Sequence, residues 1–280
     1  MTLVGVSLKT YFSHARTLDW VRRVVDIAER HPAVRSGAAQ LFVVPTFPAL
    51  VPVREVIGDA PVLLGAQDLA WADEGAFTGE VSGAELREIG VDLVEIGHAE
   101  RRSLFHETDE DVAGKVHAAY RNHLRPLVCV GEPHLPTGSA ATSLRKLRDA
   151  PEPAGVGPAS SADAIAEVTA QLDRSLATAT VDGLVGPLIV AYEPVWAIGA
   201  PAPAPDDHIV DVLAGLEAHL ASRPELAGST VIYGGSAGPG LLTRGQGRIG
   251  GLFLGRFAHD PAAITTILDE VLTLPGQRSE

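Results

Sequence analysis

Residues 188–199 read LIVAYEPVWAIG, and this stretch organises the rest of the chain. An apolar, partly β-branched run is typical of a buried parallel strand, and Pro194 stops the chain from continuing as a hydrogen-bonded strand. Glu193 is therefore expected at a strand tip. The bulky apolar residues and the glycine after it suit a loop that packs over a site and has a flexible joint. The pattern indicates a general base beneath a lid; a glutamate that merely begins a surface loop is the alternative.

Short apolar runs alternate with segments of helical period along the whole chain. Helices are predicted at 17–30, 49–57, 83–89 and 109–122, and strands at 3–8, 40–44, 61–65, 91–96, 126–130, 188–192, 230–233 and 252–254. Such alternation favours parallel strands with right-handed crossovers. Three to six strands would indicate a doubly wound sheet, whereas eight favour a closed (β/α)8 barrel, the TIM barrel, of the α/β class. We expect one domain over residues 1–280, with its site at the carboxyl ends of the strands.

Composition limits the partners and the cellular location. With 280 residues, 46% of them hydrophobic, the chain can bury a large core. A net charge of −13 argues against nucleic acid or an anionic membrane as partner. The single cysteine, Cys129, excludes an intramolecular disulfide and favours a reducing compartment. We find no signal peptide or membrane span and expect a cytoplasmic protein. Residues 134–161, rich in Pro, Ala, Gly and Ser, are expected to form a mobile excursion after the fifth strand.

Two other strand ends carry charged or titratable residues. Lys9, one of three lysines beside 19 arginines, follows the first strand and could neutralise a phosphate or polarise a carbonyl oxygen. His98 follows the fourth strand, where the sequence suits the start of a one-turn helix, whose positive end would keep the imidazole neutral. Glu100 is expected to pair with Lys9 and hold it in place. Taken alone, each of Lys9 and His98 is also compatible with an ordinary solvated side chain.

Glycines mark the ends of the last two predicted strands. The sequence reads YGGS at 233–236 and GGLFLGR at 250–256. Glycine lets backbone N–H groups approach an anion closely, and the loops after strands seven and eight of a barrel often hold a phosphate. Tight turns use the same residues, but two such segments on consecutive strands favour an anion site.

The motifs together resemble the triosephosphate isomerase family. They occur in the family's order and cover the chain from residue 3 to about 270: GAQ at 65–67, AFTGE at 76–80, GHAERR at 97–102, CVGE at 129–132, YEPVWAIG at 192–199 and YGGS at 233–236. The resemblance implies an aldose–ketose isomerase without metal or organic cofactor, acting on a small phosphorylated sugar. Glu193 would move the proton, while His98 and Lys9 would stabilise the enediolate oxygens.

The same resemblance implies the rest of the site and its assembly. Contacts to the substrate or its phosphate would come from Ser7, Gly199, Gly235, Ser236, Gly255 and Arg256, supported by Glu100, Trp196 and Tyr233. Closure of residues 194–204, the lid, would exclude water from the intermediate. The loop at 77–80 (Phe77, Thr78, Gly79, Glu80) resembles the one that the family inserts into a partner subunit, which implies a homodimer.

Departures from the family pattern bear on the substrate. Ser7 stands where the ordinary enzyme has Asn, residues 200–205 of the lid joint carry three prolines, Arg256 replaces the second glycine after strand eight, and Asp68 replaces an Asn. Ser7 in a Gly-x-Ser-x-Lys pattern resembles the branch that isomerises four-carbon ketose phosphates. The main expectation is interconversion of dihydroxyacetone phosphate and glyceraldehyde 3-phosphate, as in glycolysis and gluconeogenesis. The alternatives are an erythrulose phosphate isomerase and a non-catalytic barrel that binds a phosphorylated ligand.

Overall fold

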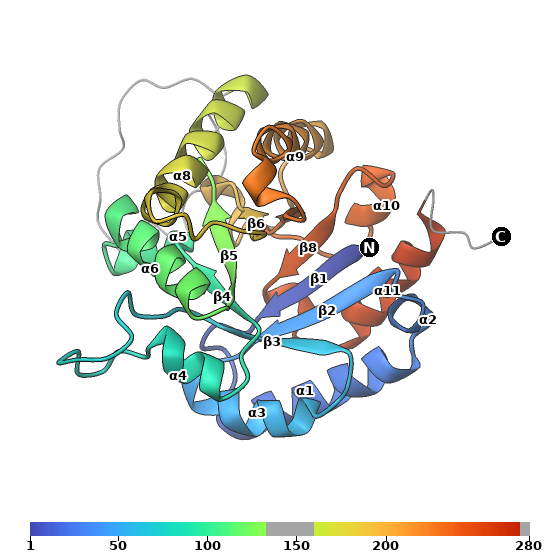
Figure 1. Ribbon diagram of the computed structural model, residues 1–280. Coiled ribbons are helices and arrows are strands. Elements are labelled where there is room, and N and C mark those ends of the chain that lie inside the picture. The colour runs from blue at the N-terminus through green and yellow to red at the C-terminus, as the bar shows by residue number, and fades with distance from the viewer. Residues whose placement is uncertain (133–159, 275–280) are drawn as a thin grey trace.

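Eight parallel strands form a closed barrel in sequence order (Figure 1). The computed structural model describes residues 1–132 and 160–274. The strands are β1 (Thr2–Ser7), β2 (Ala39–Val44), β3 (Val62–Ala66), β4 (Leu93–Ile96), β5 (Arg125–Val130), β6 (Ile189–Tyr192), β7 (Thr230–Tyr233) and β8 (Gly251–Leu254). Pairing of β1 with both β2 and β8 closes the barrel. The predicted single-domain (β/α)8 barrel is therefore confirmed.

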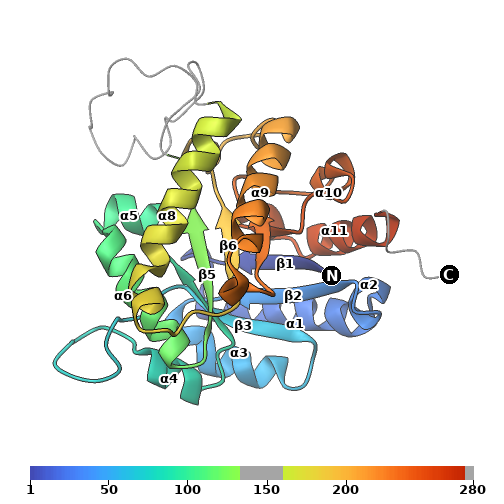
Figure 2. The same cartoon turned by 45° about the horizontal axis from the view of Figure 1, so that its top comes forward.

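Helices surround the barrel on its outside (Figures 1 and 2). They are α1 (His14–Arg30), α2 (Pro32–Arg35), α3 (Leu50–Ile57), α4 (Gly83–Glu88), α5 (Ala99–Leu104), α6 (Asp109–Arg121), α8 (Ser161–Val181), α9 (Asp206–Ala221), α10 (Leu241–Gly245) and α11 (Ala262–Thr273). Short 3-10 turns lie at η1 (Phe47–Ala49), η2 (Val195–Ala197), η3 (Pro224–Leu226) and η4 (Arg256–Ala258). The sequence explains several helix starts: Thr108 and Ser160 form capping boxes at α6 and α8.

Side chains on alternate strand positions divide into two cores. One set packs outward against the helices, and the other fills the barrel interior. Inside, the rings of Phe42 and Phe253 stack with centroids 5.7 Å apart. Only glycine fits at Gly5, because a Cβ there would lie 1.8 Å from the Phe42 ring. The interior is thus filled below the strand ends, and open space remains above them.

The strand boundaries predicted from the sequence agree with the structure to within one or two residues for most strands. β1 begins and ends one residue earlier than predicted, and β4 begins at Leu93 instead of 91. The predicted excursion at 134–161 lies outside the described residues, except that Ser160 caps α8 and Ser161 begins it. Within the described residues no helix is both long and apolar enough to cross a membrane.

Candidate active site

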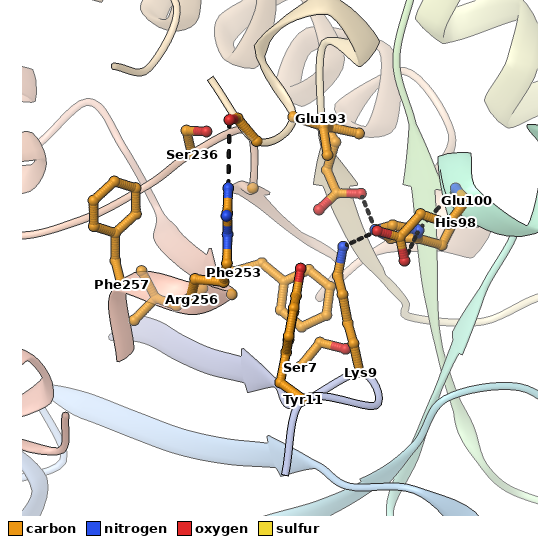
Figure 3. A pocket seen from close by; sticks show the side chains of 15 residues that line it. Ser7, Lys9, Tyr11, His98, Glu100, Glu193, Ser236, Phe253, Arg256 and Phe257 are labelled. Carbon is orange, nitrogen blue, oxygen red and sulfur yellow. Dashed lines mark hydrogen bonds and ion pairs between the residues drawn. The ribbon is translucent and has the colours of Figure 1, made fainter. Parts of the chain in front are cut away.

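A cavity of about 250 Å³ opens at the carboxyl ends of the strands (Figure 3). Its walls come from the loops after β1, β4, β6, β7 and β8, so that residues far apart in the sequence face one space. The lining residues are Ser7, Lys9, Tyr11, His98, Glu100, Glu193, Ile198, Gly199, Gly234, Ser236, Phe253, Leu254, Gly255, Arg256 and Phe257. This set includes the three residues expected to do the chemistry.

Lys9 is held in the cavity by its backbone and by an ion pair. Its φ is +45°, a left-handed conformation that is uncommon for a non-glycine residue and frequent at functional sites. The Gln67 amide donates to the Lys9 carbonyl at 3.0 Å, and Lys9 Nζ lies 2.7 Å from Glu100 Oε1. Burial opposes the ammonium charge, but Glu100 and then Glu193 outweigh burial and raise the pKa of Lys9. The cation is therefore fixed and fully charged at neutral pH.

His98 is the N-cap residue of α5, and this position defines its tautomer. Its Nδ1 accepts a hydrogen bond from the backbone N–H of Glu100 at 3.0 Å. Because Nδ1 is an acceptor, the proton of the neutral ring is on Nε2, which lies 3.2 Å from Glu193 Oε2. Burial, and then the charge of Lys9, lower the pKa of His98 well below its ordinary value. A neutral imidazole thus presents one N–H to the cavity.

Glu193 follows the last residue of β6 and is 7% exposed. Two glycines give it room: a Cβ on Gly131 would lie 2.0 Å from the Glu193 carbonyl oxygen, and one on Gly234 would lie 2.4 Å from Oε1. Within the described part of the chain, no group donates a well-aligned hydrogen bond to Glu193 Oε2. Burial raises the pKa of Glu193 to about 7, against the attraction of Lys9. A carboxylate with this pKa and a free oxygen is suited to act as a base near neutral pH.

The opposite side of the cavity consists of loop backbone and the side chains of Ser236, Arg256 and Phe257. Ser236 has a φ of +55°, and its Oγ lies 2.7 Å from the Ala197 carbonyl oxygen and 3.0 Å from that of Ala200. Arg256 Nη2 donates to the Gly199 carbonyl at 3.4 Å. Figure 3 shows Ser236, Arg256 and Phe257 grouped across the cavity from Lys9.

Two glycines expected at the phosphate differ in their placement. Gly255 lines the cavity, and a Cβ added there would have no neighbouring atom within 4 Å. Gly235 is not among the described residues that line it; its α-carbon faces the Tyr233 hydroxyl and Pro194 instead. The neighbouring residue Gly234 lines the cavity instead. It lies against the Glu193 side chain, where a Cβ would clash with the carboxylate.

The lid, residues 194–204, is tied to the barrel at both ends. Near its start, Trp196 Nε1 donates to Glu132 Oε1 at 2.8 Å. At its end, the Ala204 N–H donates to the Tyr233 hydroxyl at 3.0 Å. Trp196 and Tyr233 therefore lie outside the cavity lining but anchor the segment that covers it.

Several residues of the site were not predicted from the sequence. Glu95 lies inside the barrel and accepts a hydrogen bond from Ser7 Oγ at 2.9 Å. The sequence signal is a charged residue within an otherwise apolar strand. Tyr11 lines the cavity beside Lys9, and only its spacing from Lys9 pointed to it. Among the described residues, no group of three His, Cys, Asp or Glu side chains is placed to hold a metal ion.

Comparison with known proteins agrees with this fold. The family model described as triosephosphate isomerase matches residues 2–146 and 158–271. A protein named L-erythrulose-1-phosphate isomerase from Pectobacterium atrosepticum is 48% identical, covering 98% of this chain and 97% of the relative. One of the same name from Rhizobium etli is 37% identical, covering 96% and 91%. The crystal structure of triosephosphate isomerase from Bartonella henselae superimposes with a TM-score of 0.72 at 25% identity, covering 96% and 98%. The chain is an isomerase that belongs to the triosephosphate isomerase family.

Proposed function

We propose that the chain isomerises a four-carbon ketose phosphate, L-erythrulose 1-phosphate, by proton transfer through an enediolate. The observation that carries the chemistry is the arrangement of Glu193, neutral His98 and Lys9 around one cavity. The proposed substrate rests on the names of the two relatives and on Ser7, a small residue that lines the cavity together with Lys9. These relatives therefore support a tetrulose phosphate substrate better than the expected triose phosphate.

The proposed steps use the side chains as the geometry presents them. Glu193 Oε2 takes the proton from C3, and the electron pair moves to the carbonyl oxygen on C2. Lys9 and the Nε2–H of His98 stabilise the negative charge on the enediolate oxygens. Glu193 then returns the proton to C2, and the hydroxyl proton on O3 passes to O2 by way of His98 Nε2, which leaves the carbonyl on C3 and a hydroxyl group on C2. On a triose phosphate this transfer interconverts an aldose and a ketose; on the tetrulose, whose C3 carries a hydroxymethyl group, both partners are ketoses.

The phosphate would lie on the opposite side of the cavity. Gly199, Ser236 and Gly255 offer backbone or hydroxyl contacts there, and Arg256 adds a positive charge at the rim. Closure of the lid would keep water from the enediolate, which can otherwise lose phosphate. The ties of the lid to Glu132 and Tyr233 support this position over the cavity.

The test is an assay of the purified protein on defined substrates. L-Erythrulose 1-phosphate, its enantiomer, dihydroxyacetone phosphate and glyceraldehyde 3-phosphate would be compared by kcat/KM. We expect the highest value for L-erythrulose 1-phosphate. A higher value for the triose phosphates would overturn the proposed substrate, and no turnover of any of them would favour the non-catalytic barrel.

We also propose that the chain acts as a homodimer through the loop between β3 and α4. This loop extends away from the barrel in Figures 1 and 2 and carries Trp71 and Phe77, which are 47% and 40% exposed. Their rings contact each other edge to face at 5.5 Å, so that they form one apolar surface. Sedimentation of the wild type and of Phe77→Asp tests this: we expect a dimer that the substitution dissociates, and a monomeric wild type would contradict it.

A further inference from the structure

A buried carboxyl group lies inside the barrel directly behind the cavity. In β4, Val94 and Ile96 pack outward against the helices, while Leu93 belongs to the interior core. Strand alternation therefore turns Glu95 inward, and it is only 3% exposed. A carboxyl group in an apolar interior lowers stability unless it has hydrogen-bond partners. A buried carboxyl group this close to the cavity is therefore expected to have a function that offsets the cost of its burial.

The partner of Glu95 is the hydroxyl group of Ser7. Ser7 Oγ donates to Glu95 Oε2 at 2.9 Å, and both side chains are buried. Glu95 Oε1 lies 4.0 Å from His98 Nε2, too far for a hydrogen bond. Since Ser7 gives its one proton to Glu95, the lone pairs of its oxygen remain to accept a hydrogen bond from a ligand.

Burial, and then repulsion by Glu193, raise the pKa of Glu95 to about 8. At neutral pH the carboxyl group is therefore largely protonated. In that form it can donate a hydrogen bond as well as accept one. It can then rearrange with Ser7 to match a hydroxyl group that enters the cavity.

The position of this pair fits the fourth carbon of the proposed substrate. The residues proposed for the phosphate lie on one side of the cavity, and Ser7 and Lys9 lie at the end of β1 on the other (Figure 3). In L-erythrulose 1-phosphate the hydroxymethyl carbon, C4, is the carbon farthest from the phosphate. With C2 and C3 beside His98 and Glu193, C4 extends toward the side of the cavity that Ser7 lines.

We propose that Ser7 and Glu95 form the subsite for the terminal hydroxymethyl group of the four-carbon substrate, and so determine its selection over a triose phosphate. This inference rests on the proposed function. Ser7 provides room and a hydrogen-bond acceptor, and Glu95 orients the Ser7 hydroxyl from behind. A triose phosphate lacks the group, so it leaves the hydrogen-bonding capacity of the pair unused.

The test compares kcat/KM for L-erythrulose 1-phosphate and dihydroxyacetone phosphate in the wild type and in Ser7→Ala, Glu95→Val and Glu95→Gln. We expect Ser7→Ala and Glu95→Val to lower the tetrulose-to-triose ratio by about tenfold or more. Glu95→Gln keeps an acceptor for Ser7 and should lower it less. Ser7→Ala/Glu95→Val should resemble the single variants, because the two residues act as a unit. The matched control is Asp92→Asn at the amino end of β4, where Asp92 accepts from the Leu64 N–H, and it should leave the ratio unchanged.

A substrate analogue isolates the hydroxyl group itself. L-Erythrulose 1-phosphate with its C4 hydroxyl replaced by hydrogen should be a poorer substrate for the wild type, whereas Ser7→Ala should treat it like the parent compound. Equal loss on all substrates, or an unchanged ratio, would overturn the subsite and leave the pair a structural role. Ser7→Ala removes a single oxygen atom and carries the test even if Glu95→Val fails to fold. Wild-type preference for triose phosphates would overturn the proposed function; tetrulose activity with an unchanged ratio would overturn the subsite alone.

Discussion

The two sides of the cavity are built from different chemical groups. On the reacting side, Lys9, His98 and Glu193 are side chains fixed by ion pairs, a helix cap and close-fitting glycines, and burial shifts the pKa of two of them. On the phosphate side, the hydrogen bonds that the Ser236 and Arg256 side chains make within the described residues go to carbonyl groups of the lid. The reacting side is preorganised for charge, whereas the phosphate side depends on where the lid lies. Substitutions should therefore affect rate on the first side and substrate binding on the second.

The largest effect is expected for Glu193→Gln. Removal of the base should lower kcat by on the order of 10²–10⁴-fold, while KM changes little, because the amide keeps the shape of the side chain. Steady-state kinetics measure this, and circular dichroism checks the fold. The control is Glu217→Gln on the outer helix α9, which should keep the wild-type rate. A Glu193→Gln enzyme with near-normal kcat would remove Glu193 as the base.

Lys9→Ala should have the next largest effect. Loss of the cation that faces the enediolate oxygens should lower kcat/KM by about 10²–10³-fold, as for other preorganised oxyanion donors. Glu100, which loses its partner, should not rescue the rate. The variant should also bind phosphoglycolate more weakly than the wild type, as measured by competitive inhibition. Unchanged inhibitor binding would contradict the electrostatic role of Lys9.

The pH profile tests the base without a substitution. The pKa of Glu193 is raised to about 7, so the reactive carboxylate is lost as the pH falls through 7. We expect kcat/KM to fall about tenfold for each pH unit below that value, while His98 stays neutral. Inhibition by inorganic phosphate, measured in parallel, separates the ionisation of the phosphate group. A flat profile between pH 5.5 and 8 would show that another group is the base.

Strand-end patterns predict the reacting side better than the phosphate side for a physical reason. Glu193, His98 and Lys9 are distinctive residue types at the ends of strands, so the (β/α)8 arrangement alone brings them together. Gly234 and Gly235 are the same residue type, so the sequence cannot distinguish them. The path of the backbone determines that Gly234 faces Glu193. The sequence does not mark Glu95 as a site residue, because a strand buried on both faces shows no alternation of polar residues that would identify its inward side.

Glu95, which lies behind the reacting side of the cavity, should also make the stability of the protein depend on pH. Its pKa rises from 4.5 to about 8 on folding, so between these values the folded protein holds a proton that the unfolded chain releases. The free energy of unfolding therefore falls as the pH rises through this window, and the total loss is about 1.4 kcal/mol for each unit by which the pKa is shifted. Glu95→Gln does not titrate, so it should gain stability relative to the wild type between pH 5 and pH 8, as measured by urea unfolding. A pH-independent difference would mean that Glu95 ionises normally in the folded state.

The smallest effect is expected for Arg256→Ala, on the phosphate side. The Arg256 side chain is exposed, and its contact with the Gly199 carbonyl is long, at 3.4 Å. An exposed charge contributes little, about 0–1 kcal/mol, so KM should rise less than about tenfold and kcat should stay near that of the wild type. Added salt should reduce the difference, because the charge is in contact with solvent. The exposed Arg30→Ala on α1 serves as the control for lost charge. A large fall in kcat would mean that Arg256 belongs with the preorganised reacting groups. The two sides of the cavity would then not divide into one that sets the rate and one that sets substrate binding.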